Sequence, residues 1–485
     1  MKICLINPTN IKRDWGHSFP PLGLAYVAAV ARAKGTKIVI HDRDLLFSER
    51  PDLVQIDKET RNVILNEKPD LLGLSATTAT ITDAFRVAKL AKSIRPSVRT
   101  IVGGVHGTAL PRTTLEECSD LDVIVMGEGE ETFGEIILGK EPTAIDGLAF
   151  RSSEGIKINE LRKPIANIDS ILPPARDLLD MKKYTARSKH LIRGMSLRGT
   201  SVFTTRGCPY NCSFCCGPMV FGRGIRFHSV RYVINEIESL IDDYRIEGIY
   251  FADDMFASHR QRAIDICGEM IKRGLNKKIV FAVQLKATVV DKMLLAKLKA
   301  AGCVQVEFGF ESGSQRMLEK MNKRVKVADN LRAAELTRKT GLRMLGNFII
   351  GMPQERKEDL AETIEFIEKV RPDVIGLYKL ILLPGSQLFL EHSAKYKEAN
   401  NWELSLVDDL TTNYTDIKTE EFVRLFNRYT RRIARMNASS YLAYHLKKNM
   451  LFALADLAKI LSARIIRAMN SGLIWLRKKY REKNT

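Results

Sequence analysis

A chain of 485 residues, 45% of them hydrophobic, is long enough for two or three globular domains and too long for one ordinary core. Its formal net charge is +19, yet residues 431–485 contain 13 Lys and Arg against 2 Asp and Glu, so the rest of the chain is only mildly basic. No run of 18 apolar residues occurs and no secretory signal precedes the first expected strand, which excludes a membrane-spanning helix and predicts a reducing, cytoplasmic setting for the 8 cysteines.

Residues 1–145 alternate short apolar strands with helical stretches. The strands are expected at residues 3–6, 38–40, 71–75, 100–104 and 123–127. Helices at 22–34 and 82–94 predict βαβ units, and hence an α/β domain with a doubly wound, Rossmann-like parallel sheet. Such sheets bind ligands beyond the carboxyl ends of their strands, where Gly-rich turns admit a ligand to the backbone. No G-x-G-x-x-G follows the first strand, which argues against a nicotinamide cofactor.

Residues 146–195 contain Pro164, Pro173 and Pro174 among mixed charges, and are expected to form a linker. The βα pattern returns in residues 196–391. Strands are expected there at residues 202–205, 248–252, 279–285, 304–310, 345–350 and 374–382, with helices such as 229–244, 260–273, 292–300 and 329–340. Six βα units in series predict a partial (β/α)6, TIM-like barrel, whose chemistry gathers at the carboxyl ends of its strands.

Three cysteines follow the first barrel strand at the spacing C-x3-C-x2-C, namely Cys208, Cys212 and Cys215. A loop that bends at Gly207 and Pro209 can turn their sulfurs toward one point. Thiolates gathered this closely favour an iron–sulfur cluster or zinc. Three ligands on a four-iron cluster leave one iron open to a substrate. Structural zinc and incidental cysteines are the alternatives, although no partner pair at zinc-finger spacing follows.

The cysteine spacing, with the aromatic Phe214 just before the last thiol, resembles the radical S-adenosylmethionine (SAM) superfamily. Further family motifs lie at later strand ends, namely Asp253 and Asp254, then Glu311, Ser312 and Gly313, and then Gly351 and Pro353. The resemblance implies that the three cysteines ligate a [4Fe-4S] cluster and that the later motifs contact SAM or substrate. It also implies that the open iron chelates SAM, and that one electron from the cluster cleaves SAM to a 5'-deoxyadenosyl radical.

Four residues have a second interpretation, no assigned role, or an identity that departs from the family. Cys216 is an extra thiol without an assigned role. Asp253 and Asp254 could instead cap the following helix. After the third strand, where many relatives carry an arginine, this chain has Lys286, which keeps the charge but lacks the bidentate fork for a carboxylate.

The turns of the first domain are similar to those of the cobalamin-binding domain that precedes the cysteine motif in one large class of radical SAM enzymes. Residues 19–24, 103–106 and 127–130 carry this similarity. The implied cofactor contacts are Asn7, Pro21, Leu22, Gly23, Ser75, Thr77, Gly103, Gly104, His106, Gly127, Glu128 and Gly129. The D-x-H-x-x-G motif is absent, which fits a class whose cobalt usually lacks a histidine ligand on its lower face. His106 is alternatively a turn residue that is hydrogen-bonded locally.

Residues 392–485 are expected to form a helical, basic region without strands. Apolar residues recur at helical spacing between Met450 and Ile465, and the basic residues fall mostly on the opposite side. Such a helix either packs on its own protein or lies on an anionic membrane surface, and the second case would hint at a lipid or isoprenoid substrate. No nucleic-acid-binding fold is recognisable, so no nucleic-acid partner is expected.

Two implied cofactors for two domains lead to one main hypothesis, the methylation of an unactivated carbon. The radical would remove a hydrogen atom and methylcobalamin would supply the methyl group, with electrons from a donor such as flavodoxin or ferredoxin. Oxidative cyclisation or ring rearrangement without methyl transfer is the alternative within the family. A non-catalytic cobalamin-sensing or membrane-scaffold protein is the alternative of a different class. A methylthiotransferase would need a second cysteine trio, and the first domain holds only Cys4 and Cys118.

Overall fold

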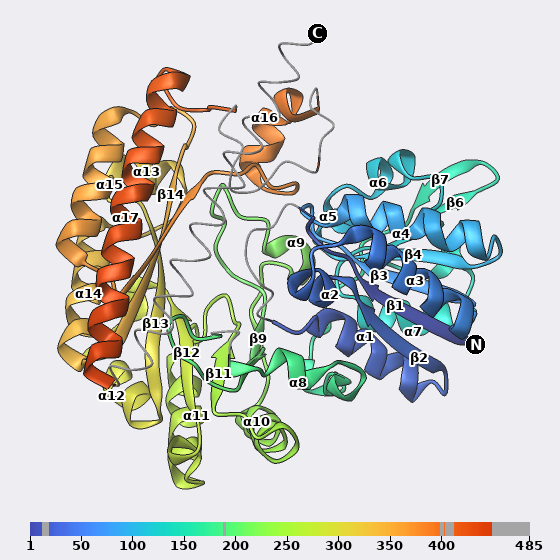
Figure 1. The fold of residues 1–485 in the computed structure, drawn as a ribbon, viewed down its shortest axis with the longest axis horizontal. Coiled ribbons are helices and arrows are strands. Elements are labelled where there is room, and N and C mark those ends of the chain that lie inside the picture. The colour runs from blue at the N-terminus through green and yellow to red at the C-terminus, as the bar shows by residue number, and fades with distance from the viewer. Residues whose placement is uncertain (12–18, 188–190, 398–401, 403–411, 449–485) are drawn as a thin grey trace.

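The computed structural model describes residues 1–11, 19–187, 191–397, 402 and 412–448. It contains a seven-stranded sheet and a curled six-stranded sheet, which lie at opposite ends of the molecule (Figure 1). The chain passes from the first sheet to the second through residues 159–198, and the cysteine motif follows the first strand of the second sheet, in the region between the two sheets.

The seven-stranded sheet has the order β2-β1-β3-β4-β5-β6-β7. Its parallel strands are β1 (Lys2–Asn7), β2 (Lys37–Asp42), β3 (Leu71–Ser75), β4 (Arg99–Gly103) and β5 (Val123–Val125). The predicted doubly wound α/β sheet is confirmed. Two antiparallel strands, β6 (Leu148–Ser152) and β7 (Gly155–Ile158), extend it into residues that the sequence predicted as a linker.

Helices cover both faces of this sheet. They are α1 (Leu22–Ala33), α2 (Arg43–Glu49), α3 (Leu53–Glu67), α4 (Ile81–Ile94), α5 (Val105–Ala109), α6 (Pro111–Glu117) and α7 (Gly129–Ile137). Because side chains alternate along a strand, Ile3 and Leu5 pack with α1 and α7, whereas Cys4 and Ile6 pack with α3 and α4. The two cores leave the carboxyl ends of the strands free to face the second sheet.

The six-stranded sheet is parallel, with the order β15-β14-β13-β12-β11-β8. Its strands are β8 (Gly199–Val202), β11 (Gly248–Phe251), β12 (Val280–Leu285), β13 (Cys303–Glu311), β14 (Arg343–Ile350) and β15 (Val374–Lys379). The helices between them are α10 (Val230–Tyr244), α11 (Arg260–Lys272), α12 (Lys292–Ala300), α13 (Gln315–Lys320), α14 (Val327–Thr340) and α15 (Lys357–Val370). This confirms the predicted partial barrel. The first strand ends at Val202, three residues earlier than predicted, because Phe203 and Thr204 leave the sheet.

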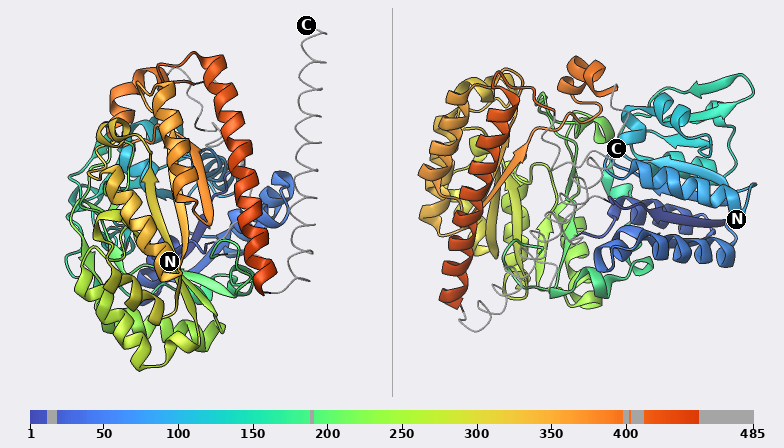
Figure 2. Two further views of the ribbon diagram at one scale, coloured as in Figure 1. Left: turned by 90° about the vertical axis from the view of Figure 1, so that its left-hand side faces the viewer. Right: turned by 45° about the horizontal axis from the view of Figure 1, so that its top comes forward.

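Short elements and two helices complete the described chain. These are α8 (Met181–Tyr184), β9 (Thr205–Arg206), α9 (Pro218–Phe221), β10 (Arg226–Phe227), α16 (Gln387–Lys397) and α17 (Thr419–Lys448). Helix α17 runs along β15 at the open edge of the barrel and buries Ile433 in the barrel core (Figures 1 and 2). The amphipathic stretch predicted from Met450 to Ile465 lies outside the described residues. In the described part of the chain, no helix is both long and apolar enough to cross a membrane.

Candidate functional site

The loop that carries the cysteines joins β9 to β10, which pair as an antiparallel ribbon beyond the end of β8. Gly207 opens the loop with φ +91°, and a Cβ there would lie 2.1 Å from the carbonyl oxygen of Gly224, so only glycine fits. Farther along, the Ser213 N–H donates to the carbonyl of Met321 at 2.9 Å, and the Leu388 N–H donates to the carbonyl of Ser213 at 3.0 Å. The loop is therefore held both at its base and near its tip.

The three sulfurs of the C-x3-C-x2-C motif surround one cavity of about 220 Å³. Cys208, Cys212 and Cys215 line it, and the adjacent Cys216 is not among its lining residues. Three thiols from one short loop around one cavity suit a polynuclear iron–sulfur cluster. The Gly217 N–H donates to the sulfur of Cys215 at 3.3 Å, a type of contact that adjusts cluster potentials.

The protonation of these thiols is coupled to what they bind. Burial raises the pKa of Cys208, Cys212 and Cys215, that of Cys215 to about 12. A thiol in this environment keeps its proton until a cation replaces it, and iron is such a cation. Binding of a metal cation by these thiols therefore releases their protons.

Charged side chains line the rest of this cavity. Glu311 has φ +63°, and its carboxylate accepts from Nζ of Lys323 at 2.7 Å. Lys286 holds Nζ 3.2 Å from the centre of the Tyr210 ring, and burial together with the charge of Lys323 lowers the pKa of Lys286 to about 8. With Asp254 and Glu307, the wall presents two ammonium groups and three carboxyl groups, which suits a zwitterionic ligand.

The two adjacent aspartates have different positions. Asp254 lines the cavity, and burial raises its pKa. Asp253 is buried behind it and binds the backbone of Thr204. Neither caps the next helix, because His259 is the N-cap of α11.

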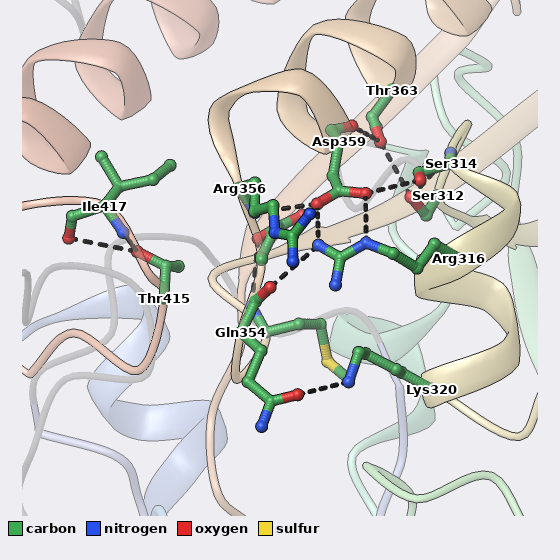
Figure 3. A network of polar contacts seen from close by, with 12 residues as sticks. Ser312, Ser314, Arg316, Lys320, Gln354, Arg356, Asp359, Thr363, Thr415 and Ile417 are labelled. Carbon is green, nitrogen blue, oxygen red and sulfur yellow. Dashed lines mark hydrogen bonds and ion pairs between the residues drawn. The ribbon is translucent and has the colours of Figure 1, made fainter.

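Ser312 and Gly313 support the cavity from behind. The Ser312 hydroxyl lies 2.8 Å from that of Thr363 on α15, and a Cβ on Gly313 would collide with the α15 backbone. The neighbouring Ser314 hydroxyl donates to Asp359 at 2.7 Å, which extends this network along the start of α15 (Figure 3). These residues hold the turn that presents Glu311.

Gly351 and Pro353 form the turn after β14, and they are not among the residues that line the cavity. The N–H groups of Gly351 and Met352 donate to one carboxylate oxygen of Glu355, at 2.5 and 3.1 Å. Burial raises the pKa of Glu355 to about 8.

A second cavity, of about 240 Å³, lies at the carboxyl edge of the seven-stranded sheet. Leu5, Leu74 and Ile101 contribute to its apolar floor, and Phe203 and Phe221 approach from the side of the cysteine loop. Of the predicted cobalamin contacts, it is lined by Gly23, Ser75, Gly103, Gly104, Gly127, Glu128 and Gly129. Because glycines expose the backbone, this cradle fits a flat projecting part of cobalamin, whose ring system is itself larger than the cavity.

The other predicted cobalamin contacts lie elsewhere. Asn7 donates to Asp42 at 2.9 Å, Pro21 and Leu22 begin α1, and Thr77 lies in an exposed turn. His106 is fully buried, with Nδ1 3.1 Å from the Thr78 hydroxyl, and burial lowers its pKa to about 4. His106 thus lies in α5, and its hydrogen-bond partner is 28 residues away rather than within its own turn.

Several cavity residues were not predicted, because they belong to no motif. In the first cavity they include Tyr210, Gln284, Glu307, Lys323 and Asn347, and in the second they include Tyr26, Phe203, Arg206, Val220 and Phe221. Gln284 could have been found, since it is the one polar residue of the otherwise apolar strand β12. Arg206 carried a weaker signal, its place directly before Gly207 and Cys208.

Comparison with known proteins identifies two families along the chain. Residues 202–367 match the Radical SAM superfamily, and residues 11–137 match the B12 binding domain. An uncharacterized methyltransferase of Pyrococcus horikoshii is 34% identical over 461 residues, which cover 93% of this chain and 94% of that protein. The anaerobic magnesium-protoporphyrin IX monomethyl ester cyclase of Rubrivivax gelatinosus is 28% identical, over 81% of this chain and 70% of the cyclase.

A solved structure shares the fold. The radical SAM methyltransferase TsrM of Kitasatospora setae, solved with cobalamin and a [4Fe-4S] cluster bound, superposes with a TM-score of 0.66 at 18% identity, over 81% of this chain and 75% of that one. Both matched families agree with the two cavities described above. The chain therefore belongs to the cobalamin-dependent radical SAM enzymes.

Proposed function

We propose that this enzyme methylates an unactivated carbon of a small-molecule substrate. The observation that carries the proposal is the placement of three thiols around one cavity beside a second, glycine-lined cavity. The Pyrococcus horikoshii relative, similar over almost its whole length, supports methyl transfer because it is named a methyltransferase.

The chain's own residues have distinct roles in this proposal. Cys208, Cys212 and Cys215 hold the cluster, while the mixed charges around Glu311 orient SAM. Glycines of the second cavity, such as Gly104, hold part of the cobalamin. When bound, these groups supply the electron, the radical and the methyl group. The protein binds and orients them and, with buried apolar residues of the cavity wall, keeps water away.

The domain division follows from these roles. We place the cobalamin-binding unit in the seven-stranded sheet, which continues past residue 145 through β7. The barrel from β8 to β15 forms the radical SAM core, and α17 closes its edge. The segment between β7 and β8 connects the two.

Cyclisation without methyl transfer is the second candidate, since the Rubrivivax gelatinosus relative is a cyclase. The two reactions differ in the mass of the product. Methylation adds one methylene unit to the substrate, whereas an oxidative cyclisation adds none.

The test is an anaerobic comparison of extracts. Protein purified with hydroxocobalamin and reconstituted with iron and sulfide is incubated with SAM, dithionite and a metabolite extract of a strain that lacks the gene. We expect S-adenosylhomocysteine, 5'-deoxyadenosine and a product heavier than an extract component by one methylene unit. Turnover with no such mass gain would replace methylation by the cyclase alternative, and failure to cleave SAM at all would contradict both.

Partners and location belong to the same proposal. The reaction needs a one-electron donor, for which flavodoxin or ferredoxin is the expected class in a reducing cytoplasm. A peripheral contact with an anionic membrane is supported by the sequence of the basic tail, residues 448–485, which contains 9 Lys and Arg against 2 Asp and Glu. Such a contact would place the enzyme near a lipid-like substrate.

A further inference from the structure

Two arginines at the base of the cysteine loop share one carboxylate of the N-terminal unit. Arg206 of β9 and Arg226 of β10 are register partners in the short ribbon. Arg206 Nη1 donates to Glu128 Oε1 at 2.7 Å, and Arg226 Nη1 donates to Glu128 Oε2 at 2.6 Å. Both ends of the cysteine loop are therefore tied to the same residue of the other unit.

Glu130 completes this clamp, by which we mean Glu128, Glu130, Arg206 and Arg226. Arg206 Nη2 donates to Glu130 Oε1 at 2.6 Å, and the side chains of Arg206, Glu128 and Glu130 are 5%, 3% and 9% exposed. The Arg206 guanidinium also lies over the Tyr26 ring, 5.1 Å from its centre. Buried charges paired in this way stay in place, because leaving one unpaired is costly.

The clamp touches both candidate cofactor sites. Arg206, Glu128 and Glu130 line the glycine-rich cavity of the N-terminal unit. Arg206 is followed directly by Gly207, whose position allows no other residue, and then by Cys208 of the three-thiol cavity. Cys208 is only two residues from Arg206. A rearrangement of the clamp at the glycine-rich cavity therefore also moves the backbone that carries a thiol of the three-thiol cavity.

We propose that the clamp couples the two cofactor sites, so that cobalamin binding and cluster formation stabilise each other. This inference rests on the proposed use of the two cavities. Cobalamin in the glycine-rich cavity packs against Arg206 and restricts the clamp, and the restricted clamp holds the cysteine loop in the geometry that the cluster needs. By linkage, the cluster strengthens cobalamin binding by the same factor. Glu128, Glu130, Arg206 and Arg226 are thus positioning residues.

The experiment compares hydroxocobalamin binding to the full-length protein with and without a cluster reconstituted from iron and sulfide. We expect the cluster to lower the Kd for hydroxocobalamin by about fivefold or more. In Glu130→Gln, this ratio of the two Kd values should fall toward one. The ratio is informative because a direct loss of affinity would affect both Kd values and cancel. Hydrogen exchange of residues 207–225 gives a second readout, with cobalamin-induced protection in the wild type and little in the variant.

Glu131→Gln is the matched control, because Glu131 is the next residue of α7 and is 53% exposed in an ion pair with Arg162. It should keep the wild-type ratio. Should Glu130→Gln fail to fold, Arg226→Lys, which keeps the charge, takes its place. The coupling is overturned if the two Kd values of the wild type are nearly equal. It is also overturned if a folded clamp variant keeps the wild-type ratio of the two Kd values. Neither binding readout requires turnover, so coupling without a methylated product would leave the inference standing and remove only the proposed reaction.

Discussion

The carboxylate of Asp253 binds Thr204 at two points. Oδ1 accepts from the Thr204 backbone N–H at 2.6 Å, and Oδ2 accepts from its hydroxyl at 2.6 Å. The Thr205 N–H adds a third hydrogen bond at 2.8 Å, and Arg262 donates to the Thr204 carbonyl at 2.9 Å. These bonds fix the chain where it leaves β8 for the cysteine loop.

Replacing Asp253 should therefore destabilise the protein even without cofactors. Asp253→Ala leaves three buried donors unpaired, and we expect it to lower the free energy of unfolding by about 3 kcal/mol or more. Urea unfolding of the metal-free protein measures this. The control is Asp254→Ala, which removes a neighbouring cavity carboxylate and should change the free energy by less than about 1 kcal/mol. Equal losses of unfolding free energy in the two variants would show that the hydrogen bonds from Thr204 to Asp253 do not contribute the expected stability.

Substitutions of two cysteines in the loop, Cys212 and Cys216, should have different effects on the cluster. Cys212→Ala removes a sulfur that lines the cavity, so the reconstituted protein should lose most of its iron and all production of 5'-deoxyadenosine. Cys216→Ser should retain wild-type iron content, because Cys216 is not among the lining residues. Iron and sulfide analysis of the two variants checks this. Loss of the cluster in Cys216→Ser would mean that the fourth thiol is a ligand.

Substitutions at two adjacent glycines of the second cavity should affect different properties, one the stability of the fold and the other the binding of cobalamin. Gly104 has φ +99°, and a Cβ there would lie 2.6 Å from the Ala76 carbonyl, so Gly104→Ala should cost about 2 kcal/mol or more. At Gly103 the nearest atom would be 3.8 Å away. Gly103→Ala should therefore fold normally but bind hydroxocobalamin more weakly, since its methyl group enters the cavity. Unchanged affinity in Gly103→Ala would argue that cobalamin lies elsewhere.

Glu355 should make stability depend on pH. Its pKa is raised from 4.5 to about 8 by burial, so between these values the folded protein binds a proton that the unfolded chain has lost. The free energy of unfolding should fall as pH rises through this window and level off above it. In Glu355→Gln this contribution is absent, so the variant should gain stability relative to the wild type from pH 5 to pH 8 in urea titrations. A constant difference across that range would exclude the raised pKa.

The basic tail gives a test of membrane contact. A chain truncated after Lys447 should stop sedimenting with vesicles of phosphatidylglycerol and phosphatidylcholine while keeping its melting temperature. Pure phosphatidylcholine vesicles serve as the control, because electrostatic attraction requires anionic lipid. Precipitation or unfolding of the truncated protein would indicate instead that the tail packs on the body.

Local patterns in the sequence determined most of the architecture. Apolar runs alternating with amphipathic stretches predicted both sheets, since strand burial and helix amphipathicity are properties of short segments. The thiol spacing likewise predicted a shared site, because a short loop brings its own residues together. The range predicted as a linker, residues 146–195, contains two strands that local patterns did not indicate. Strand β6 pairs with the free edge of β5, and β7 pairs in turn with β6, and local composition does not reveal that such an edge is available.

Only the tertiary structure decided which side chains of each motif face a cavity. Asp254 faces the thiols while Asp253 binds backbone, and Glu311 faces them while Ser312 faces α15. It also brought Glu128 to Arg206, residues 78 positions apart, at the edge of the glycine-lined cavity. Such contacts depend on how whole elements pack against each other, and no periodicity or spacing within a segment records that packing.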